Sequence, residues 1–460
     1  MPPDAGGSAT KVGVSPTAVP FRSALAFWAK LGFINFGGPA GQIALMHDEL
    51  VERRRWVSNG RYLHALNYCI LLPGPEAQQL AIYIGWLLNG TLGGIVAGVL
   101  FVLPAFFLIL GLSWAFVVHG DVAWVAAVFY GLSAAVIGIV ASAVIRVGSK
   151  ALRNGVLRAV AGAAFVGIFL LRIPFPLIVL GAGLLGFVGG RRNPEKFVPP
   201  DHHDADGDSV VGDHGAPRDA RPSLRRTSRV LVTGLVVWWG PLLTVAALRG
   251  GDDVLTKEGL FFSQAALVTF GGAYAVLAYI NQAAVQQFGW LEPGQMVTGL
   301  GLAESTPGPL IMVTEFVGFL GAYRFPGGLN PVVAGTLGAV VTVWATFAPC
   351  FLWIFLGAPY IERLRGHSSL NGALAAITAA VVGVILNLAV TFGLATLFSN
   401  VEQRTLAGMT VPVPHLATLD PFAALLAAIT FIGLWRYKWN VLAVVAGSAV
   451  AGLVFRTLFN

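Results

Sequence analysis

The tripeptide Pro-Gly-Pro occurs twice in this chain, at residues 73–75 and at residues 307–309, and both copies lie in apolar sequence. The offset between them, from residue 73 to residue 307, is 234 residues. The same offset superimposes two further landmarks without a gap: Phe36-Gly37-Gly38 on Phe270-Gly271-Gly272, and Trp56 on Trp290. Three landmarks in one register indicate that the chain contains a duplicated unit.

Proline and glycine inside apolar segments interrupt helices, because proline lacks a backbone donor and glycine is conformationally loose. In membrane transporters, interrupted segments at matching places in two halves are the best sequence pointer to the binding site. The duplicated breaks therefore predict a transporter.

Composition restricts the class of protein. Of the 460 residues, 56% are hydrophobic and 11% are charged, and the mean hydropathy is +0.74. A soluble domain averages about 25% charged residues. So few charges cannot cover a surface exposed to water, so the sequence predicts an all-α polytopic membrane protein with the lipid bilayer as its partner.

The net charge of +7 does not indicate nucleic-acid binding, because Lys and Arg lie in short clusters between apolar runs, as cytoplasmic anchors do. Arg146 and Lys150, at the end of one run, are explained as anchors of this kind. Cys69 and Cys350 both have apolar neighbours, which excludes a disulfide framework and a metal-ligand pair. We expect no cofactor and no metal, and the irregularly spaced histidines of residues 202–214 do not change this.

Apolar stretches long enough to cross a bilayer, about 20 residues, are readily located. They lie near residues 92–118, 122–146, 156–172, 174–190, 229–248, 331–357, 369–399, 417–435 and 440–458. The chain is thus predicted to comprise a disordered N-terminus (1–20), a first membrane repeat (21–190), a charged, Pro-rich cytoplasmic linker (191–228), a connecting helix and loop (229–256) and a second membrane repeat (257–460).

The segments beside each Pro-Gly-Pro, such as residues 60–72 and 76–90, are too short to cross a bilayer alone. Two interpretations fit: a re-entrant hairpin with the tripeptide at its tip, or one broken helix. We favour the hairpin, because both of its outer ends can then lie at one membrane face.

Arginines distinguish the two copies. Arg53, Arg54 and Arg55 precede Trp56, whereas Gln287, Phe288 and Gly289 precede Trp290. Equivalent loops of different charge predict that the two repeats face opposite sides of the membrane.

The segments FGGPAGQIALMHDELVERRRWVS, LLPGPEAQQLAIYIG, FGGAYAVLAYI and GLAESTPGPL resemble the chromate transporter family in its long, two-repeat form. The resemblance covers roughly residues 21–190 and 257–458. It implies a multi-pass protein of the bacterial inner membrane that extrudes chromate, with sulfate as a structural analogue. A homodimer is compatible with the sequence.

The Pro-Gly-Pro tips are the strongest candidates for anion binding. Each would end one helix and begin the next, so that backbone N–H groups and a favourable dipole face a tetrahedral dianion. The alternative is that the tripeptide only turns a loop at the interface. The substrate-binding candidates at the tips are Pro73, Gly74, Pro75, Glu76, Pro307, Gly308 and Pro309.

The duplicated Gly-Gly breaks could present a second pair of helix ends to the anion, or could serve close helix packing. Polar side chains near the breaks and tips could donate hydrogen bonds, or could join helices. These further candidates are Gly37, Gly38, Gly271 and Gly272, with Asn35, Gln42, Gln78 and Gln79.

Three carboxylates lie in apolar context beside the tips: Glu76, Glu304 and Glu315. A carboxylate in the membrane core is costly and marks function, so we expect proton coupling or gating there. For Glu76 the alternative is stabilisation of a helix N-terminus. Arg53, Arg54 and Arg55 either fix the topology or form a positive vestibule that gathers dianions.

The predicted function is secondary transport of chromate outward by alternating access, driven by the membrane potential or the proton motive force. A sulfate or other oxyanion carrier is the alternative. An intramembrane enzyme is disfavoured, because the spans hold no cluster of nucleophile, base and metal ligands.

Overall fold

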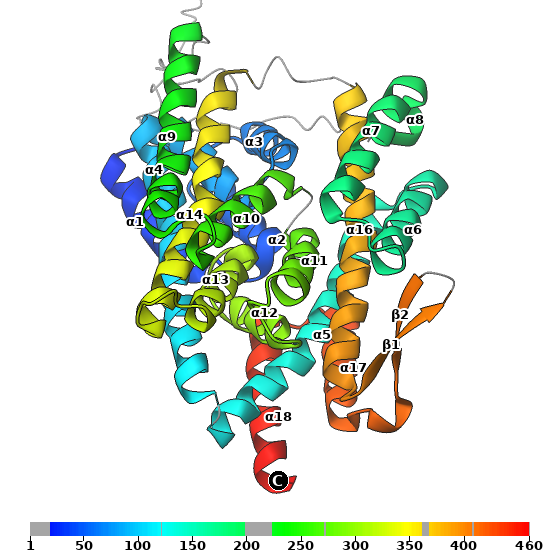
Figure 1. Cartoon of the computed structure of the whole chain (residues 1–460). Helices are drawn as coiled ribbons and strands as arrows, with labels where there is room; N and C mark the ends of the chain where they lie inside the picture. The colour runs from blue at the N-terminus through cyan, green and yellow to red at the C-terminus, as the bar shows by residue number, and fades with distance from the viewer. Residues whose placement is uncertain are drawn as a thin grey trace, which may run out of the picture.

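The structure is a computed structural model, and it describes residues 19–120, 122–197, 223–270, 273–360, 368–406 and 409–459. The predicted disordered N-terminus and most of the predicted linker, with its histidines, lie outside these residues. The described part is a helical bundle (Figure 1). Seven of its helices are long and apolar enough to cross a membrane, which confirms the predicted polytopic all-α class.

The first repeat begins with two short helices and a π-helical turn, continues through the Pro-Gly-Pro break, and ends with a helix hairpin. Its elements are α1 (Phe21–Ile34), α2 (Gly38–His47), η1 (Asp48–Arg53), α3 (Asn59–Leu71), α4 (Glu76–His119), α5 (Ala123–Ala151), α6 (Gly155–Phe169), α7 (Phe175–Arg192) and α8 (Pro194–Phe197). The helix α4 is interrupted at Asn89 and Gly90, whose dihedral angles are not helical. The segment after the tip is therefore a short helix, as predicted.

The second repeat presents the same order, π-helical turn included, after the connecting helix α9 (Leu224–Arg249), which starts before the predicted residue 229. Its elements are α10 (Val254–Val268), α11 (Ala273–Gln282), η3 (Ala283–Gln287), α12 (Gln295–Ser305), η4 (Leu310–Met312), α13 (Val313–Arg324), α14 (Pro331–Gly357), η5 (Ala358–Tyr360), α16 (Ser368–Leu397), β1 (Val401–Leu406), β2 (Met409–Pro414), η6 (Leu416–Thr418), α17 (Pro421–Arg436) and α18 (Val441–Phe459). The antiparallel pair β1 and β2 was not predicted.

Each break turns the chain back on itself. The rings of Tyr68 on α3 and Tyr83 on α4 lie 5.8 Å apart, so these two helices lie side by side across the first tip. The first helix of each repeat likewise meets the tryptophan that follows its π-helical turn, at 5.6 Å for Phe27 with Trp56 and 5.7 Å for Phe261 with Trp290. The first half of each repeat therefore contains two hairpins, one that turns before the tryptophan and one that turns at the Pro-Gly-Pro tip.

The last hairpin of each repeat packs on the long helix of the other repeat. Gly186 of α7 lies against the carbonyl of Gly372 on α16, and Gly131 of α5 lies against the carbonyl of Ser448 on α18. Small residues permit this close approach of helix backbones in a membrane. The helix α7 ends at the top of the molecule beside α8, whereas α18 ends at the bottom (Figure 1), so the two repeats have opposite orientations.

Cysteine labelling tests this inversion in the membrane. Arg55→Cys and Gln287→Cys place thiols at two exposed positions, one after η1 and one at the end of η3, that precede the paired tryptophans. We expect a membrane-impermeant maleimide to label them from opposite sides, in intact cells for one and in everted vesicles for the other. The unmodified chain is the control, since Cys69 and Cys350 are buried. Labelling of both positions from the same side would refute the inverted arrangement.

Candidate anion site

The Pro-Gly-Pro tips meet the breaks that follow α1 and α10. The backbone N–H of Gly74 donates to the carbonyl of Thr269 at 2.8 Å, and that of Gly308 donates to the carbonyl of Asn35 at 3.3 Å. Asn35 and Thr269 are related by the 234-residue offset, as the two glycines are. Each tip is therefore bound to the break of the other repeat, around one pseudo-twofold centre.

Glycine is required at both tips by conformation and by space. The φ angles of Gly74 and Gly308 are +121° and +127°, which residues with a Cβ rarely adopt. A Cβ on Gly308 would lie 2.4 Å from Cβ of Ala105, and one on Gly74 would lie 3.0 Å from Sγ of Cys350. Ala105 and Cys350 directly follow the prolines inside α4 and α14, so the two tips approach equivalent sites on the long helices.

The predicted polar side chains hold this centre together. The Gln42 Nε2, fully buried, donates to the carbonyl of Asn35 at 2.8 Å and to that of Gly308. Gln79 donates to the carbonyl of Pro73 at 2.7 Å, within its own tip. The other two amides, Asn35 and Gln78, donate to carbonyls of α4. In this conformation the four side-chain amides therefore hold backbone carbonyls in position, and these bonds are not made to an anion.

A cavity lies between the tips and is lined by Pro39, Gln42, Pro75, Glu76, Ala77, Ala273, Pro309, Leu310 and Ile311. These residues belong to the first turns of α2, α4 and α11 and to η4, which leads into α13. The N-terminal ends of four helical segments thus converge on one point. The first N–H groups of a helix have no partner within the helix and carry partial positive charge, which favours an anion.

The cavity has room for about one water molecule. A tetrahedral oxyanion is larger than that, so this conformation is closed around the cavity. Glu76 is the one ionisable residue in the lining, at the first position of α4.

Glu304 belongs to a polar group next to the cavity. The Tyr274 hydroxyl donates to Glu304 Oε1 at 2.5 Å, and Tyr274 follows Ala273 of the cavity lining. The Arg146 guanidinium on α5 interacts electrostatically with both side chains. Arg146 is exposed, whereas Tyr274 and Glu304 are buried. Arg146 was explained from the sequence as an interfacial anchor, and Tyr274 was not selected.

The remaining candidates lie elsewhere or outside the described residues. Glu315 is fully buried on α13 and is not part of the cavity lining. Gly37 and Gly38 have φ angles of +91° and +64° at the first break, but their counterparts Gly271 and Gly272 are outside the described residues.

The arginine cluster does not line the cavity. Arg53 forms salt bridges with Asp48 and Glu49, and Arg54 forms one with Glu49. The Arg54 guanidinium also lies 4.9 Å from the ring of Trp56.

In the second repeat Phe288 replaces Arg54 and stacks on Trp290 at 4.2 Å. The same loop geometry is therefore stabilised by a cation–π contact in one repeat and by an aromatic stack in the other. The role of these arginines as a vestibule stays a prediction.

Arg146→Gln is expected to lower chromate uptake by everted vesicles up to about fivefold, because Arg146 is exposed and water screens its charge, so losing its interaction with Tyr274 and Glu304 costs at most about 1 kcal/mol. Arg146→Lys should recover part of the rate, since it retains the charge. The matched control is Arg153→Gln. Arg153 is also exposed, lies just after α5, and donates to the carbonyl of Lys150. Equal rates for Arg146→Gln and the control would argue against a role of Arg146 at the site.

Comparison with known proteins agrees with these features. A family model described as "Chromate transporter" matches residues 23–187 and 257–453. A "Chromate transport protein" of Cupriavidus metallidurans is 30% identical over 462 residues, covering 100% of this chain and 99% of that protein. One of Pseudomonas aeruginosa is 30% identical over 449 residues, covering 96% and 94%. No solved structure matches this one.

Proposed function

Because this chain belongs to the chromate transporter family, we propose that it exports chromate and binds the dianion in the cavity between the two Pro-Gly-Pro tips. The observation that carries the proposal is the convergence of four helical N-termini on that cavity. Backbone N–H groups at these ends can replace the water that a dianion loses on entering the membrane. Transporters with inverted repeats use half-helix ends in this way for anionic substrates.

The cross-repeat hydrogen bonds suggest how access alternates. Gly74 binds Thr269 and Gly308 binds Asn35, so the closed centre is held by two equivalent contacts. Because the repeats face opposite ways, opening one contact would connect the cavity to one side of the membrane, and opening the other would connect it to the opposite side. Rocking of one repeat against the other around a fixed site is the usual form of this cycle.

Glu76 sets the charge of the site. An ionised carboxylate in the cavity lining would repel a dianion, so chromate binding requires Glu76 to carry a proton. Release of that proton to the cytoplasm after chromate has left, as the empty site turns inward again, would couple export to the inward proton gradient. Coupling of this kind makes Glu76 a proton-binding residue of the transport cycle rather than only the first residue of α4.

The membrane potential favours export. A dianion leaving a cell with a negative interior gains about 4.6 kcal/mol per 100 mV, since each charge contributes about 2.3 kcal/mol. Export needs only a selective path, whereas import against this potential would require cation symport.

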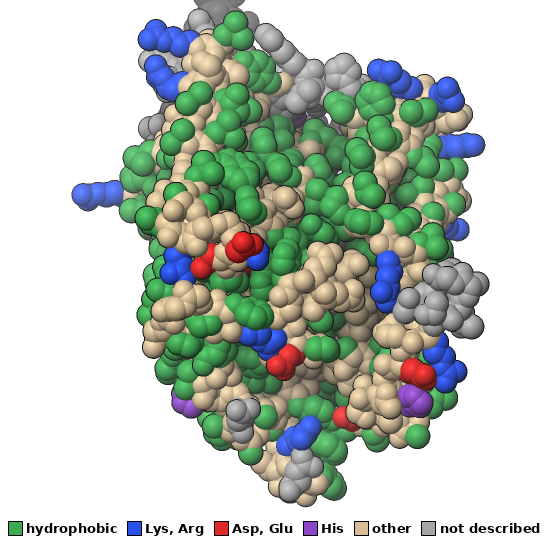
Figure 2. All heavy atoms as spheres, in the orientation of Figure 1, with side chains coloured by type: hydrophobic (Ala, Val, Ile, Leu, Met, Phe, Trp, Pro, Cys, Tyr) green, Lys and Arg blue, Asp and Glu red, His purple; other side chains and the backbone are tan. Residues whose placement is uncertain are grey.

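The charge distribution supports an orientation in the bacterial inner membrane. Lys and Arg side chains gather at the top of the molecule (Figure 2), where α7 ends with Arg191 and Arg192 and α9 begins with Arg225 and Arg226 nearby. Basic residues flank membrane helices on the cytoplasmic side. This end, and with it the linker between the repeats, is therefore assigned to the cytoplasm.

Everted vesicles test the function directly. Vesicles that contain the protein should take up radiolabelled chromate when an interior-positive potential is imposed, and vesicles from cells lacking the protein should not. Helix N-termini also suit other tetrahedral dianions, so sulfate is the second candidate and is tested with molybdate and phosphate as competitors. Uptake no faster than in the empty vesicles would refute chromate transport, and stronger competition by sulfate than by chromate itself would assign the protein to sulfate.

A further inference from the structure

A carboxylate that the sequence did not single out lies buried far from the cavity. Glu258 on α10 is 0% exposed, and neither of its carboxylate oxygens has a hydrogen-bond partner among the described residues. The backbone amide of Ala322 interacts with this carboxyl group, but that amide is also part of the hydrogen-bond ladder of α13. A buried carboxylate that shares one helical amide and has no counter-ion is most stable as the neutral acid.

Two glycines make the space for this side chain. A Cβ on Gly321 of α13 would lie 2.6 Å from Glu258 Oε1, and a Cβ on Gly338 of α14 would lie 2.9 Å from Oε2. The carboxyl group therefore sits in the seam between α13 and α14, where Gly321 also lies against Trp290 and Gly338 against the carbonyl of Gly318. An apolar side chain could fill this space, so packing alone does not explain a carboxyl group there.

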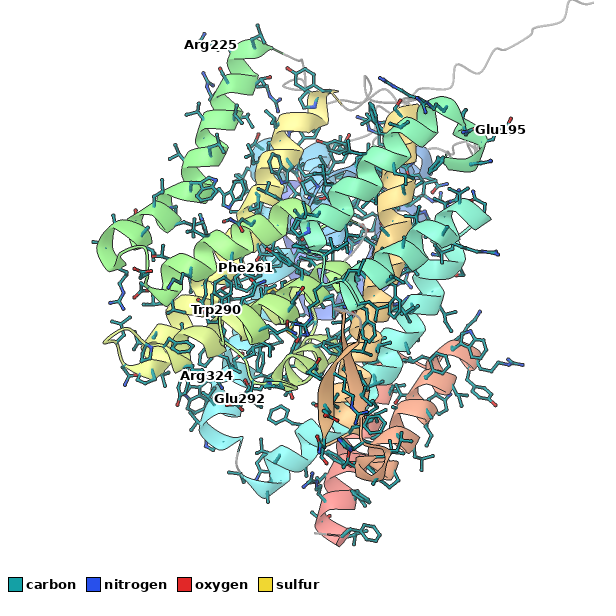
Figure 3. The ribbon with its side chains drawn as sticks, turned by 45° about the vertical axis from the view of Figure 1, so that its right-hand side comes forward. Glu195, Arg225, Phe261, Trp290, Glu292 and Arg324 are labelled. Carbon is teal, nitrogen blue, oxygen red and sulfur yellow. The ribbon has the colours of Figure 1, made fainter. Side chains whose placement is uncertain are left out.

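The charges around Glu258 are paired with one another. On α10 itself Asp253 bridges to Arg249 of α9 at 3.0 Å, and Lys257 bridges to Asp252 at 3.5 Å. In the loop before α12 and at the end of α13, Glu292 and Arg324 form a pair at 2.7 Å (Figure 3). Tyr323 of α13 stacks on Phe319, and α14 contains no Asp, Glu, Lys, Arg or His.

The Glu292–Arg324 pair lies well below Arg225 and Glu195 (Figure 3). Helix α9 begins at the end assigned above to the cytoplasm and is long enough to cross a membrane, so Arg249 at its other end lies on the external side together with its partner Asp253. Glu258 is separated from them by about one helical turn of α10, since Asp253 caps that helix. Under the orientation proposed above, Glu258 is buried just beneath the external surface. Protons from external water reach this end of the protein first.

Two further polar groups without a partner among the described residues follow, one in the same seam and one further along α13 toward the second tip. The Thr342 hydroxyl, one turn after Gly338 on α14, would meet a Cβ on Gly318, one turn before Ala322 on α13. Glu315 follows, six residues before Gly321 and thus about 9 Å along the helix. Both oxygens of Glu315 are also without a partner among the described residues, and Glu315 lies on the helix that begins at the second tip.

The first repeat lacks this series. At the 234-residue offset Ala24 occupies the place of Glu258 and Ala81 that of Glu315. Ala97 corresponds to Thr342, because it precedes Pro104 by the same number of residues as Thr342 precedes Pro349. The polar seam therefore belongs to the second repeat alone and is not a requirement of the shared fold.

We infer that Glu258 is a proton-binding site and the external end of a proton path that runs along the α13–α14 seam through Thr342 to Glu315. A proton from external water binds the Glu258 carboxylate, passes by way of the Thr342 hydroxyl to the Glu315 carboxylate, and is released to the cytoplasm as the dianion moves outward. No bond other than O–H is formed or broken. The inference rests on the proposed export of an anion, and it adds the route by which the coupling proton enters.

Glu258→Gln separates this role from substrate binding. The amide mimics the neutral acid in size but cannot release a proton. In everted vesicles we expect chromate uptake driven by an interior-positive potential alone to stay within about twofold of the unmodified protein. The acceleration produced by an acidic lumen, and the proton efflux that a fluorescent pH indicator records on chromate addition, should both be lost.

Gly321→Ala provides a second variant, because its Cβ would displace the carboxyl group, and press on Trp290 at 2.9 Å, without removing either side chain; the acceleration should be lost here too. Glu292→Gln, which removes an exposed carboxylate from the same end of the protein, should keep the acceleration. Full retention of the acceleration in Glu258→Gln would overturn the inference. Loss of both kinds of uptake in Glu258→Gln and Gly321→Ala, with normal amounts of protein in the membrane, would also overturn it in favour of a structural role. Failure of the proposed function would instead appear as no potential-driven uptake by the unmodified protein.

Discussion

Gly308→Ala is expected to lower the initial rate of chromate uptake by everted vesicles about 100-fold, with the protein still present in the membrane. A residue with a side chain at φ +127° carries a backbone strain of about 1–3 kcal/mol. The new Cβ would also overlap Cβ of Ala105 at 2.4 Å, so the tip would have to move away from α4. That movement would disturb the hydrogen bond from Gly308 to Asn35 at the centre of the molecule.

Two variants check the cause of this loss. Gly111→Ala is the matched control, since a Cβ at this position of α4 meets no atom within 4 Å. Adding Ala105→Gly to Gly308→Ala removes the overlap but leaves the φ strain, so we expect only partial recovery. An uptake rate for Gly308→Ala equal to that of Gly111→Ala would show that the geometry of the tip is not needed for transport.

Gln42→Leu is expected to lower the uptake rate about 10-fold, because it removes a side chain that bonds the first break to the second tip. The buried carbonyl of Gly308 loses this donor at a cost of about 1–3 kcal/mol, whereas that of Asn35 keeps the N–H of Gly308. No equivalent residue can replace it from the second repeat, where the 234-residue offset places the apolar Val276. The rate and the membrane yield of the protein are measured together.

The control for this variant is Gln286→Leu, which removes an amide from an exposed position in η3. It should transport at the normal rate. A normal rate for Gln42→Leu as well would mean that the contact between the first break and the second tip can be lost without consequence, and the closed centre would then not be part of the transport cycle.

The predicted helices agree with the structure where a local rule decides them. Apolar runs of sufficient length became α5, α9, α14 and α16, because a spanning segment must satisfy its own backbone in lipid. The breaks at residues 73–75 and 307–309 follow from proline and glycine alone. The strands β1 and β2 were not predicted, since the short polar stretch that forms them has no strong alternation.

The candidate site was predicted in part. The tips, Gln42 and Glu76 were selected from the sequence, and the structure brings them to one cavity. Arg146 and Tyr274 were not selected, because their approach to Glu304 depends on how α5 packs beside α11 and α12. Glu258 was overlooked for a similar reason: only the folded chain reveals that its carboxylate is buried without a counter-ion among the described residues.

The sequence by itself determined that this is a duplicated membrane protein with two broken segments in each half, because apolar length, proline and glycine act through the chain's own backbone. Only the tertiary structure decided which parts meet. Each tip binds the break of the opposite repeat, and each terminal hairpin packs on the opposite long helix. The physical reason is that such contacts join residues far apart in sequence, and their choice depends on the shape and polarity of surfaces that exist only after the helices have packed.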